Sequence, residues 1–281
     1  MSCWRNLDPT RYGPPLRSHT EHRPDMLTID YVEAYKDNYI WLIHSPTDAT
    51  RIIAVDPGDA SPVEDWLERN CCTLAAILVT HRHWDHVNGI EPLVEHWGCP
   101  VWGPANERVP CVTTTLRERD TVEVEGLCFT VLDIPGHTAG HIAYHGHGIA
   151  LVGDTLFVAG CGRLFEGTPA QMVDSLSKLR ALPGATKVYC AHEYTEANLR
   201  FAAAVDPGNP LLLQRAAAAR SLRVLNKPTI PSTISEEIVT NPFLRWDAPA
   251  IQVAAAKQAG NTPRNAVEVF ATVRLWKDNF T

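Results

Sequence analysis

A short apolar segment that opens directly onto a cluster of histidines constrains this chain more than any other feature. Residues 74–79 are continuously hydrophobic, and residues 80–86 then read Thr-His-Arg-His-Trp-Asp-His. A run of this kind is typical of a strand that is buried on both faces, with further layers packed on each side of its sheet. The histidines therefore fall in a loop at the end of an interior strand, where functional side chains often gather.

The cluster itself predicts a metal site. Three imidazoles and one carboxylate occupy six positions of a chain that has 12 histidines in 281 residues. Such nitrogen and oxygen donors suit zinc, iron or manganese in a catalytic site. In an extended segment His81 and His83 point to the same side, so both can reach one ion, while Asp85 and His86 on the next turn can reach a second. A lone histidine is more often a hydrogen-bonded surface or core residue, but the whole cluster indicates a metalloenzyme.

Three later segments repeat the arrangement of an apolar strand that ends in a candidate ligand. His137 follows a Pro-Gly turn, Asp154 follows a Gly after residues 149–152, and His192 follows residues 187–191. A strand fixes the position of such side chains and a loop gives them freedom of orientation. These residues are expected to complete the metal site.

Four motifs thus occur in order along the chain: Thr80-His81-x-His83-x-Asp85-His86, Gly136-His137-Thr138, Gly153-Asp154-Thr155 and His192-Glu193-Tyr194. In that order they resemble the metallo-β-lactamase superfamily. More narrowly, residues 153–163, 192–195, 241–245 and 274–280 resemble glyoxalase II, the hydroxyacylglutathione hydrolases. The resemblance runs from about Leu27 to the C-terminus.

The resemblance implies a site for two divalent ions. It places His81, His83 and His137 on one ion, Asp85, His86 and His192 on the other, and Asp154 between them. Zinc is the expected metal, with iron or manganese as alternatives. The implied reaction is attack of a hydroxide held by both ions on the thioester of S-D-lactoylglutathione, or of another 2-hydroxyacylglutathione, which yields glutathione and D-lactate in the second step of methylglyoxal detoxification. A thioester suits this chemistry because a thiolate leaves readily.

Two further residues near the motifs are interpreted differently. His141 follows His137 by four positions, and the implied ligands are already complete without it, so it is interpreted as a supporting histidine. Asp56 ends a strand before a Pro-Gly pair and is interpreted as structural.

The resemblance also implies where the glutathione part of the substrate binds. Arg274 and Lys277 match the family's anchors, and a final helix over residues 264–277 would place them on one face. Tyr194 would offer a hydroxyl. Arg163 and Phe165 stand where family members often carry Lys and Tyr, so the charge is kept and one hydroxyl is lost. The alternative interpretation of Arg274 and Lys277 is a solvated basic helix face.

The implied fold is α/β: a metallo-β-lactamase αββα sandwich of two packed mixed sheets flanked by helices, followed by a C-terminal α-helical domain. We expect a disordered leader over 1–25, a catalytic domain over 26–193 and a helical substrate-binding domain over 194–281. Helices are predicted at 62–70, 90–97, 169–182, 194–205 and 211–225, with two more between 248 and 277. Alanine-rich residues 215–220 support helix by propensity.

Composition excludes several other classes of protein. The formal net charge is −7 and no dense Lys/Arg run is present, which argues against a nucleic-acid surface. No apolar stretch reaches membrane-spanning length, and residues 1–25 lack the apolar core of a secretory signal. Eight cysteines without a CxxC pair favour a reducing cytoplasm. The expected partner is a small-molecule glutathione thioester, bound by a monomer.

Three alternatives to glyoxalase II remain at this point. A mononuclear-iron persulfide dioxygenase shares the histidine motif but needs neither a second metal nor the basic C-terminal helix. A β-lactamase, lactonase or other hydrolase of the same fold is disfavoured by the C-terminal helices. A non-catalytic scaffold would show gaps among the ligands, and the sequence has none.

Overall fold

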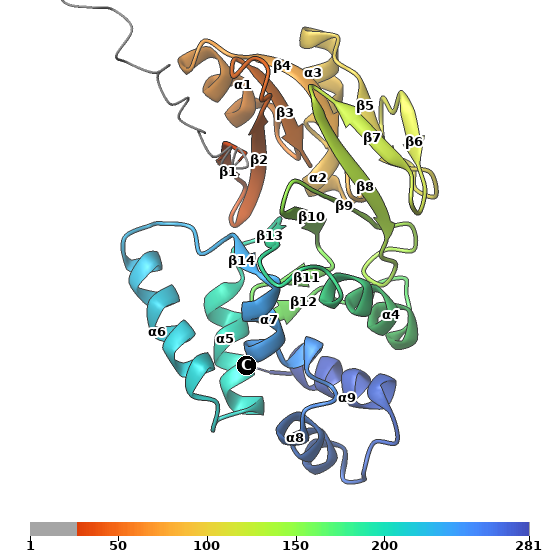
Figure 1. Ribbon diagram of the computed structural model, residues 1–281, viewed down its shortest axis with the longest axis vertical. Coiled ribbons are helices and arrows are strands. Elements are labelled where there is room, and N and C mark those ends of the chain that lie inside the picture. Colours follow the sequence, from red (N-terminus) through yellow and green to blue (C-terminus); the bar gives the residue numbers. More distant parts are fainter. Residues whose placement is uncertain (1–26, 281) are drawn as a thin grey trace, which may run out of the picture.

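The computed structural model describes residues 27–280, so the leader expected at 1–25 lies outside the described part of the chain. Two six-stranded mixed sheets pack face to face (Figure 1). One has the strand order β1-β2-β3-β4-β5-β6, and the other has the order β14-β13-β10-β9-β8-β7. The predicted sandwich is therefore confirmed.

The strands of the first sheet are β1 Ile29–Ala34, β2 Asn38–His44, β3 Arg51–Val55, β4 Thr73–Leu78, β5 Val101–Pro104 and β6 Thr114–Leu116. Those of the second are β7 Thr121–Val124, β8 Leu127–Asp133, β9 Ile142–Gly146, β10 Ile149–Gly153, β13 Lys187–Cys190 and β14 Ser232–Thr233. A small ribbon pairs β11 Leu156–Phe157 with β12 Gly160–Cys161. The helices are α1 Ala60–Arg69, α2 Trp84–Val87, α3 Ile90–Trp97, α4 Pro169–Arg180, α5 Thr195–Val205, α6 Pro210–Val224, α7 Ile234–Thr240, the 3₁₀ helix η1 Pro242–Leu244, α8 Pro249–Ala259 and α9 Ala266–Asp278.

Strand β2 shows why the interior strands are apolar throughout. Trp41 and Ile43 face the core between the sheets, whereas Ile40 and Leu42 face the core beneath α1 and α3. Successive side chains of a strand point to opposite faces, so a strand covered on both sides needs hydrophobic residues at every position. The same reason accounts for the apolar run that forms β4.

The two sheets are joined by polar contacts beside the histidine loop. The Tyr144 hydroxyl, on β9, donates to the Val79 carbonyl at 2.8 Å, and the Ile142 amide donates to the Thr80 carbonyl at 3.0 Å. These bonds hold the end of β4 against the second sheet. The loop that follows β4 is thereby fixed relative to the loops that follow β8, β10 and β13.

The C-terminal helices α5 to α9 gather at one end of the molecule (Figure 1). Phe243 on η1 and Phe270 and Val273 on α9 belong to the same hydrophobic cluster as the residues between the sheets. The helical part therefore shares a continuous core with the sandwich. No helix of residues 27–280 is long and apolar enough to cross a membrane.

The predicted helices are present and differ from the prediction only at their ends, but the short helices α2, α7 and η1 were not predicted. Helix α1 begins two residues early because the Asp59 side chain accepts from the Ser61 amide and caps it. Helix α4 ends at Arg180, two residues before the predicted end. Helix α7 was missed, although Thr233 and Glu236 form a capping box at its start.

Candidate metal centre

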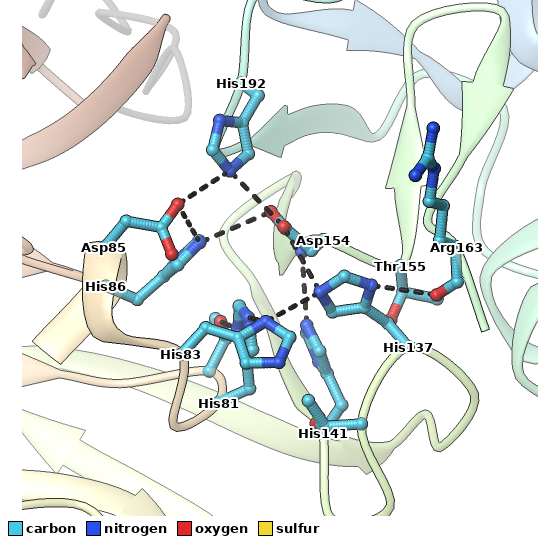
Figure 2. Close-up of polar contacts among 12 residues, drawn as sticks. His81, His83, Asp85, His86, His137, His141, Asp154, Thr155, Arg163 and His192 are labelled. Atoms are coloured by element: carbon cyan, nitrogen blue, oxygen red, sulfur yellow. Dashed lines mark hydrogen bonds and ion pairs between the residues drawn. The ribbon is translucent and has the colours of Figure 1, made fainter. Parts of the chain in front are cut away.

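The seven side chains expected as ligands converge at the strand ends (Figure 2). Donor atoms of His81, His83 and His137 lie within 4.8 Å of one another, as do those of Asp85, His86 and His192. The seventh, Asp154, lies between the two groups: its carboxylate is 3.4 Å from His137 Nε2, 3.3 Å from His192 Nε2 and 3.6 Å from His86 Nε2.

Three histidines are oriented by bonds on their outer nitrogens. His137 Nδ1 lies 2.9 Å from the Arg163 carbonyl, His192 Nδ1 lies 2.8 Å from Asp37, and His86 Nδ1 lies 3.2 Å from Asp56. In each ring Nδ1 has an acceptor, which favours a proton on Nδ1 and directs Nε2 towards the cluster. Such bonds fix both the tautomer and the ring plane of a metal-ligating histidine.

The turn after β1 supplies two contacts that sequence reasoning missed. Besides Asp37 on His192, Asn38 donates from Nδ2 to the Asp85 carboxylate at 3.1 Å and to the Asp85 carbonyl at 3.2 Å. Residues 37–38 lie far from both partners in the chain and carry no motif of their own. The available signal was a polar Asp-Asn pair, which is common in turns.

Asp56 and His141 lie behind the cluster, as their interpretation from sequence requires. Asp56 accepts from the Thr80 amide and hydroxyl, both at 2.7 Å, in addition to its contact with His86. His141 is fully buried, stacks on His81 with ring centroids 4.5 Å apart, and accepts from the Asp154 amide. Asp56, His81 and His86 also lie close enough to hold an ion, but both Asp56 oxygens already have partners.

The two groups of donors differ in their electrostatics. Burial lowers the pKa of His81, His83 and His137, so these rings are neutral donors. Burial opposes charge on His86 and His192 too, but the Asp154 carboxylate prevails and raises both pKa values, that of His192 to about 9. Burial alone would raise the pKa of Asp154, but His192 and His86 hold it well below its usual value. The centre is thus an anionic carboxylate that attracts positive charge.

Two buried atoms at this centre indicate that the residues fit divalent metal ions. His86 Nε2 and Asp154 Oδ1 have no hydrogen-bond partner among the described residues. They face each other at 3.6 Å, too far for a hydrogen bond. A buried polar atom without a partner is costly, and metal coordination would satisfy both atoms at once.

A cavity of about 770 Å³ extends from the cluster to helix α9. Its lining includes all five residues expected to contact substrate: Arg163, Phe165, Tyr194, Arg274 and Lys277. The Tyr194 ring stacks on His192 at 4.8 Å, and burial raises its pKa, so its hydroxyl remains a donor. Phe165 is 63% exposed and its ring lies 5.7 Å from that of His83.

The two residues on α9 are not equivalent. Arg274 is only 6% exposed and donates to the Cys161 carbonyl at 2.9 Å and to Asp278 at 2.9 Å. Lys277 is half-buried and donates to the Ala197 carbonyl at 3.1 Å, which leaves two ammonium protons for other acceptors. Both residues line the cavity, but the guanidinium of Arg274 already has internal partners. The interpretation as a solvated helix face is therefore wrong for Arg274.

Comparison with known proteins covers nearly the whole described chain. A family model for the metallo-beta-lactamase superfamily matches residues 38–192, and one for the hydroxyacylglutathione hydrolase C-terminus matches residues 193–280. The chain is 48% identical over 256 residues to a hydroxyacylglutathione hydrolase of Pseudomonas fluorescens, covering 91% of this chain and 100% of that protein. It is 51% identical over 259 residues to one of Pseudomonas aeruginosa, with the same coverage.

Solved structures share the architecture. That of ETHE1 from Myxococcus xanthus has a TM-score of 0.62 and 25% identity, and the match covers 89% of this chain and 98% of that one. The BLEG-1 B3 metallo-beta-lactamase has a TM-score of 0.60 and 20% identity over 77% of this chain and 99% of its own. At this identity the lactamase shows a common fold alone.

Proposed function

The chain belongs to the hydroxyacylglutathione hydrolase (glyoxalase II) family of the metallo-β-lactamase superfamily, and from this we propose that it hydrolyses S-D-lactoylglutathione to glutathione and D-lactate at a centre of two divalent ions. Thioester hydrolysis is the reaction of the family. The assignment of roles to individual side chains is our proposal. It is carried by one observation: the cavity that exposes the metal donors also exposes the cations of α9.

We assign His81, His83 and His137 to one ion and Asp85, His86 and His192 to the other, with Asp154 between them. The distances within each group and the position of Asp154 support this assignment. Divalent ions bound there would supply Lewis acidity and make hydroxide available near neutral pH. The protein's part is to keep His81, His83 and His137 neutral, and to hold the rings of His192, His86 and His137 in fixed planes through Asp37, Asp56 and the Arg163 carbonyl.

The remaining cavity residues bind and orient the glutathione portion. Lys277 offers a point charge and Arg163, whose side chain is 66% exposed, offers a guanidinium for a substrate carboxylate. The Tyr194 hydroxyl is placed to donate to a peptide carbonyl. Arg274 contributes mainly by fixing the segment around Cys161 against α9. A carboxylate held at this end of the cavity would direct the thioester towards the metal donors.

Four expectations from the sequence remain proposals: zinc as the metal, a monomer, a cytoplasmic location, and the division into a catalytic part over 26–193 and a substrate-binding part over 194–281. The mixed imidazole and carboxylate donors suit zinc but also iron and manganese. Free thiols at Cys71, Cys99 and the other described cysteines suit a reducing compartment. The basic residues that α9 contributes to the cavity support the substrate-binding role of the second part.

The deciding experiment is hydrolysis of S-D-lactoylglutathione by protein of measured metal content, with and without a chelator. We expect metal-dependent loss of the thioester absorbance, with activity restored when metal is added back. S-lactoyl-N-acetylcysteamine, a thioester without the glutathione carboxylates, is the matched control and should react with a much higher KM. A fully metallated protein that turns over neither substrate would refute the proposal. Turnover of glutathione persulfide instead would favour the dioxygenase alternative.

A further inference from the structure

The loop after β5 carries a carboxylate that joins two separate segments of the metal centre. Glu107 accepts from the Arg82 amide at 2.6 Å through Oε2. Through Oε1 it accepts from the Thr138 hydroxyl and from the Gly140 amide, the latter at 3.0 Å. Arg82 lies between His81 and His83, and Thr138 follows His137. One side chain thus bonds to both segments that supply the first group of donors.

A second carboxylate also joins these two segments. Glu166 pairs with the Arg82 guanidinium through Oε1 and accepts from the Ala139 amide at 2.9 Å through Oε2. Glu166 comes from the loop before α4, whereas Glu107 comes from the loop after β5. Two unrelated loops therefore place the same functional group across the same gap.

The two segments that these carboxylates join also contact each other, through His83 and His137. His83 Nδ1 lies 3.0 Å from His137 Nε2. Glu107 is packed tightly against the second segment, because a Cβ on Gly140 would lie only 2.6 Å from Glu107 Cγ. Backbone amides are two of the three donors to Glu107 and one of the two donors to Glu166, so these bonds act directly on the paths of the two segments.

We infer that Glu107 and Glu166 are positioning residues that together set the separation of His83 and His137 and so the affinity of the first metal group. The inference rests on the proposed function, because it takes His81, His83 and His137 as ligands of one ion. Neither carboxylate is itself within the cluster. Their effect passes through backbone amides, so it should fall on one ion and leave the group of Asp85, His86 and His192 unchanged.

The test is zinc titration of metal-free protein against a chromophoric chelator, for wild type, Glu107→Gln and Glu166→Gln. A glutamine keeps the shape but presents an NH₂ group to one of the amides that the carboxylate accepts from. Loss of such a supporting contact typically weakens metal affinity by about 10- to 100-fold. We expect this loss for one zinc equivalent only, with the other as in wild type. The kcat should fall while KM for the thioester stays within about 2-fold.

Glu125→Gln is the matched control. Glu125 accepts two bonds from Arg51, at 2.6 and 2.8 Å, in the turn between β7 and β8 and contacts no ligand segment. Its variant should bind both zinc equivalents as wild type does. If Glu107→Gln does not fold, Thr138→Val removes a single donor to Glu107 and should weaken the same zinc equivalent by a smaller factor.

The outcomes separate this inference from the proposed function. Wild-type protein that binds no zinc would overturn the proposed function. Wild-type protein that binds two equivalents, together with variants of unchanged zinc affinity, would overturn only the positioning role. A variant that weakens both equivalents alike, with a lower melting temperature, would show a general structural role and would also overturn the inference.

Discussion

The metal centre shares one cavity with Arg274 and Lys277 of α9, here called the basic wall. The two regions differ in how their polar atoms are partnered. At the centre, two buried atoms, His86 Nε2 and Asp154 Oδ1, face each other without a partner. On α9, Arg274 donates to Cys161 and Asp278 through its two terminal nitrogens, although its Nε has no partner among the described residues, and Lys277 donates to Ala197. The donors of the centre thus face one another across a shared space, whereas the wall is held mainly by bonds to the rest of the fold.

This difference predicts that removing a side chain has different effects at the metal centre and on α9. At the centre, removing a donor should abolish binding of an ion but change the stability of the metal-free protein little, because the neighbouring histidines also bond to residues outside the cluster. On the wall, removing a cation should affect both substrate affinity and stability, in proportion to its internal bonds. The following predictions test that contrast.

The largest effect is expected for Asp154→Asn. The substitution keeps the shape and removes the charge between the two groups of donors. Loss of a contact that merely supports a ligand costs about 10- to 100-fold, so loss of this central carboxylate should lower kcat by more than about 100-fold. Metal analysis and thioester turnover on the same preparation check this. If the variant kept both ions and a tenth of the activity, the view that the metal centre depends on this carboxylate would be wrong.

Next in size are Lys277→Ala and Arg274→Ala. A hydrogen bond to a charged group contributes about 1.5–3 kcal/mol, so Lys277→Ala should raise KM by about 10- to 100-fold with kcat nearly unchanged. Arg274→Ala should also lower the free energy of unfolding by about 1.5–3 kcal/mol, because Arg274 has two internal partners. Steady-state kinetics and urea unfolding separate the two. If both variants were equally stable, the view that the internal bonds of Arg274 stabilise the fold would be contradicted.

A smaller effect should appear as the pH rises. Burial, and then the nearby Arg274, Arg200 and Arg163, lower the pKa of Lys277 to about 8. Lys277 loses its charge above that pH, so KM should rise by up to about 10-fold at pH 9, one unit above the pKa. Lys277→Arg keeps the charge and should remove this dependence.

The effect of pH on folding stability has the opposite sign to its effect on substrate affinity. Between about pH 8 and the ordinary lysine pKa of 10.5, the unfolded chain binds more protons at Lys277 than the folded one does. The contribution of Lys277 to folding stability should therefore become more favourable as the pH rises through that window. A KM that falls from pH 7 to 9 in wild type, but not in Lys277→Arg, would contradict the assignment of Lys277 as an anion-binding group.

The smallest effect is expected for Phe165→Tyr. Phe165 is exposed in the cavity beside His83, so an added hydroxyl meets water and substrate rather than packed core. One neutral hydrogen bond contributes about 0.5–1.5 kcal/mol, which would lower KM by about 2- to 10-fold. Phe129→Tyr is the contrasting variant, since Phe129 is fully buried in the core between the sheets and an added hydroxyl there should destabilise the protein. An unchanged KM for Phe165→Tyr would mean that the hydroxyl is not used.

The positions of the seven candidate ligands could be predicted because each belongs to a local pattern, an apolar strand followed by a turn. His192, for example, follows β13 directly, and Asp154 follows β10, its parallel neighbour, so their convergence is a property of the sheet. Helices α5, α6, α8 and α9 of the C-terminal part were predicted from composition and spacing in the same way, whereas α7 was not.

The supporting contacts could not be predicted, because they join segments that are distant in the chain. Asp37 and His192 are 155 residues apart, and Arg274 and Cys161 are 113 residues apart. No periodicity relates such residues. The partners of Arg274 in particular turn a residue expected to bind substrate into one that also holds the fold together.

The contacts between Tyr144 and Val79 and between Ile142 and Thr80 place the metal centre on the seam between the two sheets. His81 to His86 extend from the first sheet, and His137, Asp154 and His192 extend from the second. Ions bound across this seam would act as cross-links between the halves of the sandwich. Each would stabilise the folded state by about 2.7 kcal/mol when its free concentration is 100 times its dissociation constant. The supply of metal would then determine the thermal stability and lifetime of the protein as well as its catalytic rate.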